Sequence, residues 1–215
     1  MIVLAIDTST SACSSALWRD GAVMARRLAV MARGQSEALM PMVAETMAES
    51  GLGFADLDLL AVTVGPGAFT GLRIGLAAAR GLALASNLPL AGISTPLAVA
   101  AAIPVAQRRS RTLLSVIDSR RDEAWVQAYA PDLTPLGEVE ALLPAQAAER
   151  YRMPVVVAGD GAAGLLPLLA DGVAADAPGW PDAALVAELA ARHWTAGTAL
   201  SPEPLYLRPP DVTVP

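Results

Sequence analysis

One segment constrains the fold of this chain more than any other: GPGAFTGLRIGLAAARGLALA, which runs from Gly65 to Ala85. An apolar and β-branched run, Asp58 to Val64, comes directly before it and predicts a buried strand. Glycines then mark a tight turn, and a long apolar stretch without proline predicts a helix. The expected unit is therefore strand, turn and helix, which is typical of α/β proteins.

The motif turn consists of Gly65, Pro66, Gly67 and Thr70. Glycine suits places where the backbone takes a positive φ or closely approaches another group, and proline fixes one torsion. Thr70, or Ala68 to Thr70 collectively, is expected to start the helix, and the Thr70 hydroxyl can accept from free amides there. Such amides also form an anion site in some proteins. The segment matches neither the P-loop nor the GxGxxG pattern, so a structural turn is favoured and the anion site is the alternative.

Small residues recur along the predicted helix at a spacing of four, at Gly71, Gly75 and Ala79, beside a second stripe of Ala78, Leu82 and Ala85. Glycine inside a helix costs roughly 1 kcal/mol relative to alanine. Two interior glycines therefore need a packing reason. We expect that reason to be the close approach of another helix.

Three segments together carry a family resemblance: IVLAIDTST at the start, GPGAFTGLRIG in the middle and VIDSRRDEAW further on. They resemble the bacterial TsaB family, the dimerisation subunit of the machinery that makes threonylcarbamoyladenosine in tRNA. The resemblance extends from Met1 to Arg208. It implies an actin/hexokinase/Hsp70-like (ASKHA) fold and a non-catalytic role beside the related transferase TsaD.

Composition excludes several classes of protein. Apolar residues make up 54% of the 215 residues, yet no uninterrupted apolar run of about 18 residues occurs, so a membrane span is not expected. Met1 to Thr10 contains Asp7 and predicts a strand, not a signal peptide. The single cysteine, Cys13, excludes an internal disulfide, and the cytoplasm is the expected location. A net charge of −6 without lysine makes the chain a poor solitary tRNA ligand.

The first half predicts a β-meander followed by helices. Strands are expected at Ile2 to Asp7, Cys13 to Trp18 and Val23 to Leu28, with a hairpin turn at Arg19 to Gly21. A helix from Gln35 to Ser50 presents Leu39, Met42, Val43 and Met47 on one stripe. Methionines on a helix indicate either core or an adaptable contact surface, and both stay open. The remaining expected elements are a strand at Pro89 to Thr95 and a helix at Pro96 to Ile103.

The pattern then restarts. Ile117 and Asp118 end a strand as Ile6 and Asp7 do, a strand through Trp125 and Tyr129 follows, and a third is expected near Leu136 to Ala141. Pro154 to Leu166 repeats the strand, glycine turn and helix of the central motif. Two matching pairs in the same order predict duplicated β-β-β-α-β-α lobes, each a mixed sheet with helices.

Two domains are therefore expected: a first ASKHA lobe at 1–107 and a second, smaller one at 108–215. An edge strand is expected at Gly172 to Pro178 and a last helix from Pro181 and Asp182 to about Thr195, with packing back on the first lobe as one option for this helix. Arg108, Arg109 and Arg111 lie in the connection between the lobes, where a solvated linker is favoured over a phosphate contact. The proline-rich tail is expected to be extended and to fray beyond Arg208.

Carboxylates at strand ends are the candidates for a nucleotide cleft. Proteins of the superfold hold Mg–ATP between such groups, and Asp7, Asp118 and Asp160 occupy the corresponding positions. Thr8, Ser9 and Thr10 could cradle phosphate. The charged turn from Ser119 to Asp122 is an unlikely second cradle. We favour the interpretation that Asp7, Thr8, Asp118 and Asp160 are vestiges that brace turns.

A metal site is not expected. The related TsaD carries a helix-borne pair of histidines, whereas this chain has His193 as its one histidine and Arg33 to Ser36 at the corresponding helix. The resemblance therefore excludes the transferase chemistry, and the glycopeptidase activity once ascribed to such proteins, for this chain alone. No cofactor is expected. A Ser-His-Asp triad using His193 lacks a G-x-S-x-G elbow.

Two hypotheses compete. In the first, implied by the resemblance, the chain is a scaffold that binds TsaD, joins the ATPase TsaE in a larger complex, meets tRNA only through that complex and forms a homodimer when alone. The expected contacts, chosen by helical phase, are Leu39, Met42, Val43, Met47, Gly71, Leu72, Gly75, Ala78, Ala79 and Leu82. In the second, the chain is a nucleotide-binding ATPase or kinase that uses Asp7 and Asp118.

Overall fold

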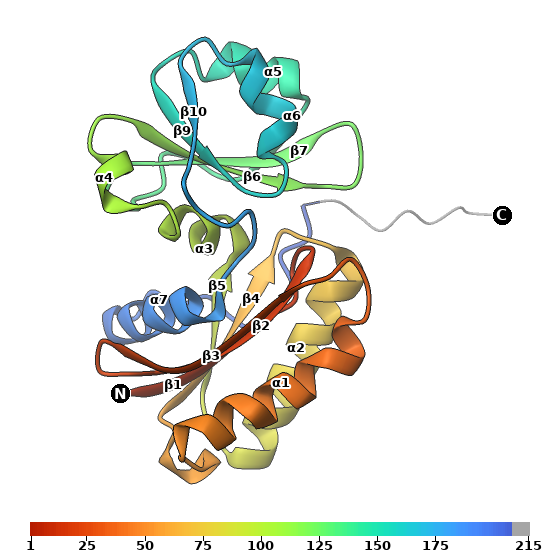
Figure 1. Cartoon of the computed structure of the whole chain (residues 1–215), viewed down its shortest axis with the longest axis vertical. Coiled ribbons are helices and arrows are strands. Elements are labelled where there is room, and N and C mark those ends of the chain that lie inside the picture. The colour runs from red at the N-terminus through yellow and green to blue at the C-terminus, as the bar shows by residue number, and fades with distance from the viewer. Residues whose placement is uncertain (208–215) are drawn as a thin grey trace, which may run out of the picture.

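A computed structural model describes residues 1–207 as two α/β lobes, one above the other in Figure 1. The first lobe is built on a five-stranded sheet in the order β3-β2-β1-β4-β5. The second has a five-stranded sheet in the order β10-β9-β6-β7-β8. Counting outward from β1 and from β6, the two orders match strand for strand, which confirms the duplicated mixed sheets.

The first sheet combines a hairpin with a parallel half. β1 pairs antiparallel with β2 and parallel with β4, β2 pairs antiparallel with β3, and β4 pairs parallel with β5. The bounds are β1 Ile2–Asp7, β2 Ala12–Arg19, β3 Ala22–Val30, α1 Gln35–Ser50, β4 Leu59–Gly65, α2 Phe69–Ser86, β5 Leu90–Ser94, α3 Thr95–Ala101 and α4 Val105–Arg108.

The second sheet repeats these pairings. β6 pairs antiparallel with β7 and parallel with β9, β7 pairs antiparallel with β8, and β9 pairs parallel with β10. Its elements are β6 Thr112–Asp118, β7 Ala124–Tyr129, β8 Glu140–Leu142, α5 Pro144–Arg150, β9 Val155–Ala158, α6 Ala162–Leu165 and β10 Gly172–Ala174. The strand expected at Leu136 to Ala141 is displaced to Glu140–Leu142.

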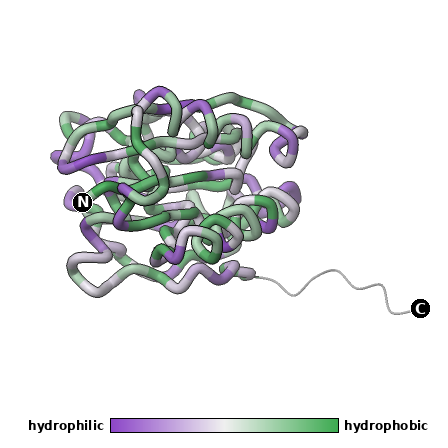
Figure 2. The backbone as a smooth tube through the Cα atoms, turned by 90° about the horizontal axis from the view of Figure 1, so that it is seen from below, coloured by the Kyte–Doolittle hydropathy of each residue, from purple (hydrophilic) through white to green (hydrophobic). Residues whose placement is uncertain are grey.

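Both faces of the first sheet are buried, which explains why β1 is apolar at every position before Asp7. Leu4 and Ile6 point to the face covered by α1 and α2, while Val3 and Ala5 point to the opposite face. Figure 2 shows the hydrophobic residues gathered along the inner strands and the hydrophilic ones in outer loops.

The opposite face of the first sheet is covered by the last helix, α7 Ala183–Ala196. Asp182 caps this helix by accepting from the amide of Ala184 at 3.0 Å, and its carboxylate also pairs with Arg26 of β3 at 2.7 Å. Val186 and Leu189 lie in the same cluster as Val3 of β1. The chain therefore returns to the first lobe after forming the second, and α7 packs against the part of the structure formed by residues 1–107.

Helix α3 connects the two cores. Ala98 packs in the cluster between the first sheet and α7, whereas Val99 and Ala100 of the helix pack with Leu113 of the second sheet. In Figure 1 this helix lies between the lobes. Because one short helix contributes to both cores, the lobes are held in a defined relation at this point.

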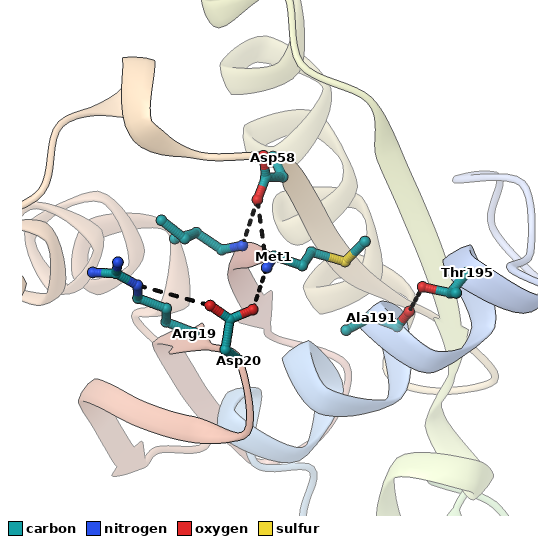
Figure 3. A network of polar contacts seen from close by, with 7 residues as sticks. Met1, Arg19, Asp20, Asp58, Ala191 and Thr195 are labelled. Atoms are coloured by element: carbon teal, nitrogen blue, oxygen red, sulfur yellow. Dashed lines mark hydrogen bonds and ion pairs between the residues drawn. The ribbon is translucent and has the colours of Figure 1, made fainter.

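The start of the first sheet is fastened by a polar network (Figure 3). The Met1 ammonium group pairs with the Asp20 carboxylate, and the amide of Ile2 donates to Asp58 Oδ2 at 2.7 Å. Asp20 lies in the β2–β3 hairpin turn, and Asp58 directly precedes β4. The network therefore links the beginning of β1 to both neighbouring strands.

After α7, the segment of residues 198–207 runs along the first lobe. Leu200 pairs with Gly92 at the edge of β5, and the amide of Leu205 donates to the Val64 carbonyl at 2.7 Å. Arg80 of α2 donates to the Pro202 carbonyl at 3.0 Å. The expected fraying beyond Arg208 lies outside the described residues. Over the described part of the chain, no helix is both long and apolar enough to cross a membrane.

Candidate functional site

The glycine turn between β4 and α2 is packed against the turn that follows β1. Gly65 takes a positive φ of 104°, as expected. A Cβ atom on Gly67 would lie 2.2 Å from the Ser9 carbonyl oxygen, and one on Gly71 would lie 2.1 Å from that of Thr8. The Ala68 amide donates to the Ser9 carbonyl at 2.7 Å. Glycine is therefore required at positions 67 and 71 because the backbone there lies against the backbone of the turn after β1.

The reason for the interior glycines of α2 differs from the expectation. A Cβ on Gly75 would lie 2.6 Å from Thr8 Oγ1, and that hydroxyl donates to the Gly71 carbonyl at 2.7 Å. The group that approaches α2 closely is thus Thr8, in the turn after β1 of the same chain, and not another helix. The spacing of four predicted a close approach correctly but could not identify its partner.

The helix starts within the expected range of Ala68 to Thr70, but the expected capping by the Thr70 hydroxyl is wrong. Helix α2 begins at Phe69, its N-cap is Ala68, and no side chain caps it. Thr70 is exposed and lines a cavity described below. The helix start is held instead by the backbone bond from Ala68 to Ser9.

Asp7 is completely buried beneath this turn. Its Oδ1 atom accepts from Ser9 Oγ at 2.6 Å, from the Ser9 amide at 3.1 Å and from Thr63 Oγ1 at 2.6 Å. Its Oδ2 atom has no partner among the described residues. Burial raises the pKa of Asp7 to about 6 against the lowering effect of these donors, and the charge of Asp160 raises it slightly further.

The other two carboxylates lie together in the second lobe. Asp160 Oδ1 accepts from the Asp118 amide at 2.8 Å, and burial raises the pKa of Asp160. Asp118 Oδ1 accepts from the Arg120 amide at 2.7 Å, and its Oδ2 pairs with the Arg120 guanidinium at 3.2 Å. Arg120 also donates to Ser11 Oγ in the first lobe. One arginine therefore bridges the turns after β1 and β6.

The predicted phosphate cradle is already occupied by the chain itself. Thr8, Ser9 and Thr10 are all buried. Thr8 Oγ1 is bonded to Gly71, Ser9 Oγ is bonded to Asp7, and the Ser9 carbonyl receives the Ala68 amide. The arrangement braces a turn, which supports the vestigial interpretation of Asp7, Thr8, Asp118 and Asp160.

A cavity of about 520 Å³ lies between the lobes beside the glycine turn. The wall from the first lobe includes Phe69, Thr70 and Arg73 from the start of α2, with Tyr206 from the C-terminal segment. Arg120, Arg121 and Trp125 form the wall from the second lobe. A helical spacing of four makes Phe69 and Arg73 neighbours, which is a weak signal for this pair. Nothing in it placed Tyr206 beside them.

Most of the predicted partner contacts are buried in the chain's own core. In helix α1, Leu39, Val43 and Met47 pack under the helix, while Met42 is half-buried. The corresponding residues of α2 are Gly71, Leu72, Gly75 and Ala79, which are buried, and Ala78 and Leu82, which are half-buried. The helical phase chosen from the sequence is therefore the core-facing one, because apolar residues on an amphipathic helix mark the face that packs on its own sheet.

The lobe connection and His193 have structural partners. Arg108 donates to the Ile103 carbonyl at 2.7 Å and to the Ala101 carbonyl at 2.8 Å, and Arg111 pairs with Asp171 at 2.7 Å. His193 Nδ1 lies 2.9 Å from Thr198 Oγ1, and burial lowers the pKa of this histidine. The described residues contain no group of three or more histidine, cysteine, aspartate or glutamate side chains arranged to hold a metal ion.

Two duplicated mixed-sheet lobes, with carboxylates at the ends of β1 and β6, define a protein of the actin/hexokinase-like (ASKHA) class. Solved structures agree at the level of the fold. The activator of the 2-hydroxyisocaproyl-CoA dehydratase from Clostridium difficile superposes with a TM-score of 0.53 over 92% of this chain and 97% of that one, at 12% identity.

Closer relatives identify the family. The YeaZ structure from Pseudomonas aeruginosa has a TM-score of 0.83 and 31% identity, covering 96% of this chain and 99% of that one. Residues 29–163 match the family model of TsaD, tRNA N6-adenosine threonylcarbamoyltransferase. The tRNA threonylcarbamoyladenosine biosynthesis protein TsaB of Escherichia coli is 41% identical over 132 residues, 61% of this chain and 56% of that protein. The chain belongs to the TsaB (YeaZ) family. The match spans about half the length of the curated relatives, 56% in Escherichia coli and 52% in Haemophilus influenzae.

Proposed function

We propose that this chain is a non-catalytic subunit that binds a TsaD-type transferase and is required for threonylcarbamoyl transfer to the tRNA adenosine next to the anticodon. The Escherichia coli relative is named as a biosynthesis protein of this tRNA modification, which supports the pathway. The observation that carries the scaffold role is an exposed apolar surface on the two adjacent helices α1 and α2.

This docking face consists of Met40, Ala44 and Ala48 on α1 with Ala77, Gly81 and Leu84 on α2. Leu84 is 87% exposed and Met40 is 45% exposed, although both are large apolar side chains. The other four residues are small, and nothing lies within 4 Å of the Cβ position of Gly81. Small exposed residues let a second pair of helices approach closely, as helix-to-helix packing requires.

The docking face replaces the residues predicted from helical phase. The buried set holds α1 and α2 against the sheet, and the exposed set on the same helices is free for a partner. A stable interface buries about 800 Å² on each side. The two helices, 16 and 18 residues long, offer enough length for an interface of that size. The same face would form the homodimer that is expected of the chain when the transferase is missing.

The rest of the proposed assembly follows from this docking. The transferase supplies the paired histidines for metal chemistry, since this chain has one histidine. The ATPase TsaE joins the larger complex, and tRNA is held mainly by the other subunits because this chain carries a net charge of −6.

The alternative of a nucleotide-binding ATPase or kinase is not favoured by the geometry. Asp7 is fully buried, and the Asp118 carboxylate is paired with Arg120, so neither carboxylate is free to hold Mg–ATP. Calorimetric titration of the chain with Mg–ATP is therefore expected to give no heat of binding. Tight binding that disappears in Asp7→Asn would favour the enzyme instead.

The docking face is tested by Gly81→Arg. The substitution places a long charged side chain in the centre of the face, where it would be desolvated without a partner. We expect co-purification with the TsaD-type transferase to be lost, together with threonylcarbamoyl transfer to tRNA in a reconstituted assay. Folding should be unaffected because the site is open to solvent.

The matched control is Gly164→Arg in α6 of the second lobe. Gly164 is also an exposed helical glycine with nothing within 4 Å of its Cβ position. This variant should co-purify normally with the transferase. Retention of the partner by both Gly81→Arg and Leu84→Glu would show that docking uses another surface.

A further inference from the structure

The cavity between the lobes has the size and lining of a ligand site that the scaffold role does not use. Its volume, about 520 Å³, falls within the range of roughly 300–1,000 Å³ common for ligand pockets. Its lining includes Pro66, Gly67 and Ala68 of the glycine turn but not the buried Asp7. The lining combines aromatic rings and arginines from both lobes.

Two aromatic rings at this cavity are unusually exposed. Phe69 is 45% exposed and Tyr206 is 42% exposed, with ring centroids 5.5 Å apart. The Arg73 guanidinium lies 3.8 Å from the Phe69 ring centroid, and its Nε donates to the Tyr206 hydroxyl at 3.0 Å. These contacts fix the two rings although neither is buried. Because the Arg73 guanidinium covers one face of Phe69, a planar ligand would stack on the exposed remainder of this aromatic surface.

Positive charge surrounds this surface. Arg73 uses only its Nε in a hydrogen bond to the described residues, which leaves its terminal nitrogens available. Arg120 and Arg121 face the same cavity from the second lobe, and Arg120 lies there while it is paired with the Asp118 carboxylate and bonded to Ser11. The start of α2, whose N-cap side chain provides no cap, adds the positive end of an 18-residue helix. A chain with a net charge of −6 thus concentrates three arginines around one cavity.

We propose that this cavity binds an unpaired nucleotide of an RNA strand, with the base stacked on Phe69 and Tyr206 and the flanking phosphates held by Arg73, Arg120 and Arg121. Stacking platforms combined with arginines are the common means of binding single-stranded nucleic acid. The inference rests on the proposed role in tRNA modification, which brings single-stranded loop nucleotides to the complex. It gives this subunit a direct RNA contact that the overall charge does not predict.

The test uses the full chain and a single-stranded RNA of about ten nucleotides with a central 4-thiouridine. Photocrosslinking at low salt, followed by peptide mapping, should place crosslinks in residues 66–73, 119–125 or 205–207. Phe69→Ala should weaken binding about ten-fold, since one stacked base is lost. Arg121→Gln should reduce the slope of log affinity against log salt by about 0.7.

Control variants and ligands separate the possible results. Arg152→Gln and Trp194→Ala remove an exposed arginine and an exposed aromatic residue that do not line the cavity, and should leave binding unchanged. Gly81→Arg should keep its RNA crosslinks while losing the transferase, so the two proposals can fail separately. Crosslinks elsewhere, equal binding of duplex RNA, or competition by free AMP at the same concentration as RNA would overturn the RNA assignment.

Discussion

Replacing Gly71 with alanine is expected to lower the free energy of unfolding by about 3 kcal/mol, the upper part of the usual range for overpacking. The added methyl group would lie 2.1 Å from the Thr8 carbonyl oxygen, a backbone atom that cannot rotate away. Either α2 must move off the sheet or the turn after β1 must shift. Both changes would disturb the Thr8 bond to the Gly71 carbonyl. Urea unfolding followed by circular dichroism measures the change.

The matched control lies on the same helix. Gly81→Ala introduces the same methyl group where nothing lies within 4 Å, so the variant should gain up to about 1 kcal/mol from helix propensity. Opposite signs at two glycines ten residues apart on one helix would separate packing from propensity. Equal effects at the two sites would refute the close contact between α2 at Gly71 and the turn after β1 at Thr8.

The second large effect concerns pH and Asp7. Burial raises the pKa of this carboxyl from its ordinary value of 3.8 to about 6 in the folded chain. Between these two pH values the folded chain keeps a proton that the unfolded chain releases. Stability should therefore fall as pH rises from about 4 to about 6, and then level off. A shift of about two pKa units corresponds to about 3 kcal/mol.

Asp7→Asn tests this dependence because asparagine cannot ionise. Its Oδ1 can still accept from Ser9 and Thr63, while its amide nitrogen takes the place of the partnerless Oδ2. That buried donor costs about 1–3 kcal/mol at every pH. The diagnostic quantity is the difference between the two stability curves: the variant should gain relative to the parent as pH rises from 4 to 6. Parallel curves would mean that Asp7 titrates normally.

Much of the fold could be predicted from sequence because the periodicity of apolar residues indicates strands and helices directly. The strand Ile2–Asp7 and the helix Gln35–Ser50 occur at the predicted bounds, and α2 begins one residue before the expected Thr70. Two related sheets were predicted from the repetition of Ile6-Asp7 at Ile117-Asp118 together with the second strand, glycine turn and helix at Pro154 to Leu166. These signals are local or repeated along the chain, so they can be interpreted without knowledge of tertiary contacts.

The candidate site was harder to predict because it depends on contacts between distant segments. Helical phase showed that one side of α1 and α2 is apolar, but an apolar stripe looks alike whether it meets a partner or the chain's own sheet. Gly75 faces Thr8, which lies more than sixty residues earlier. Tyr206 reaches Phe69 only because the chain returns to the first lobe after α7. The spacing of residues in the sequence does not identify either of these two contact partners.

The return of α7 to the first sheet also governs how the molecule can assemble during synthesis on the ribosome. The face containing Val3 stays uncovered until Val186 and Leu189 have emerged, late in translation. The second lobe, by contrast, has all its strands between Thr112 and Ala174 and can condense earlier. During synthesis the second lobe can therefore be completed before the first lobe, which needs the last helix. A fragment that stops short of this helix would expose an apolar face of the first sheet to chaperones and proteases.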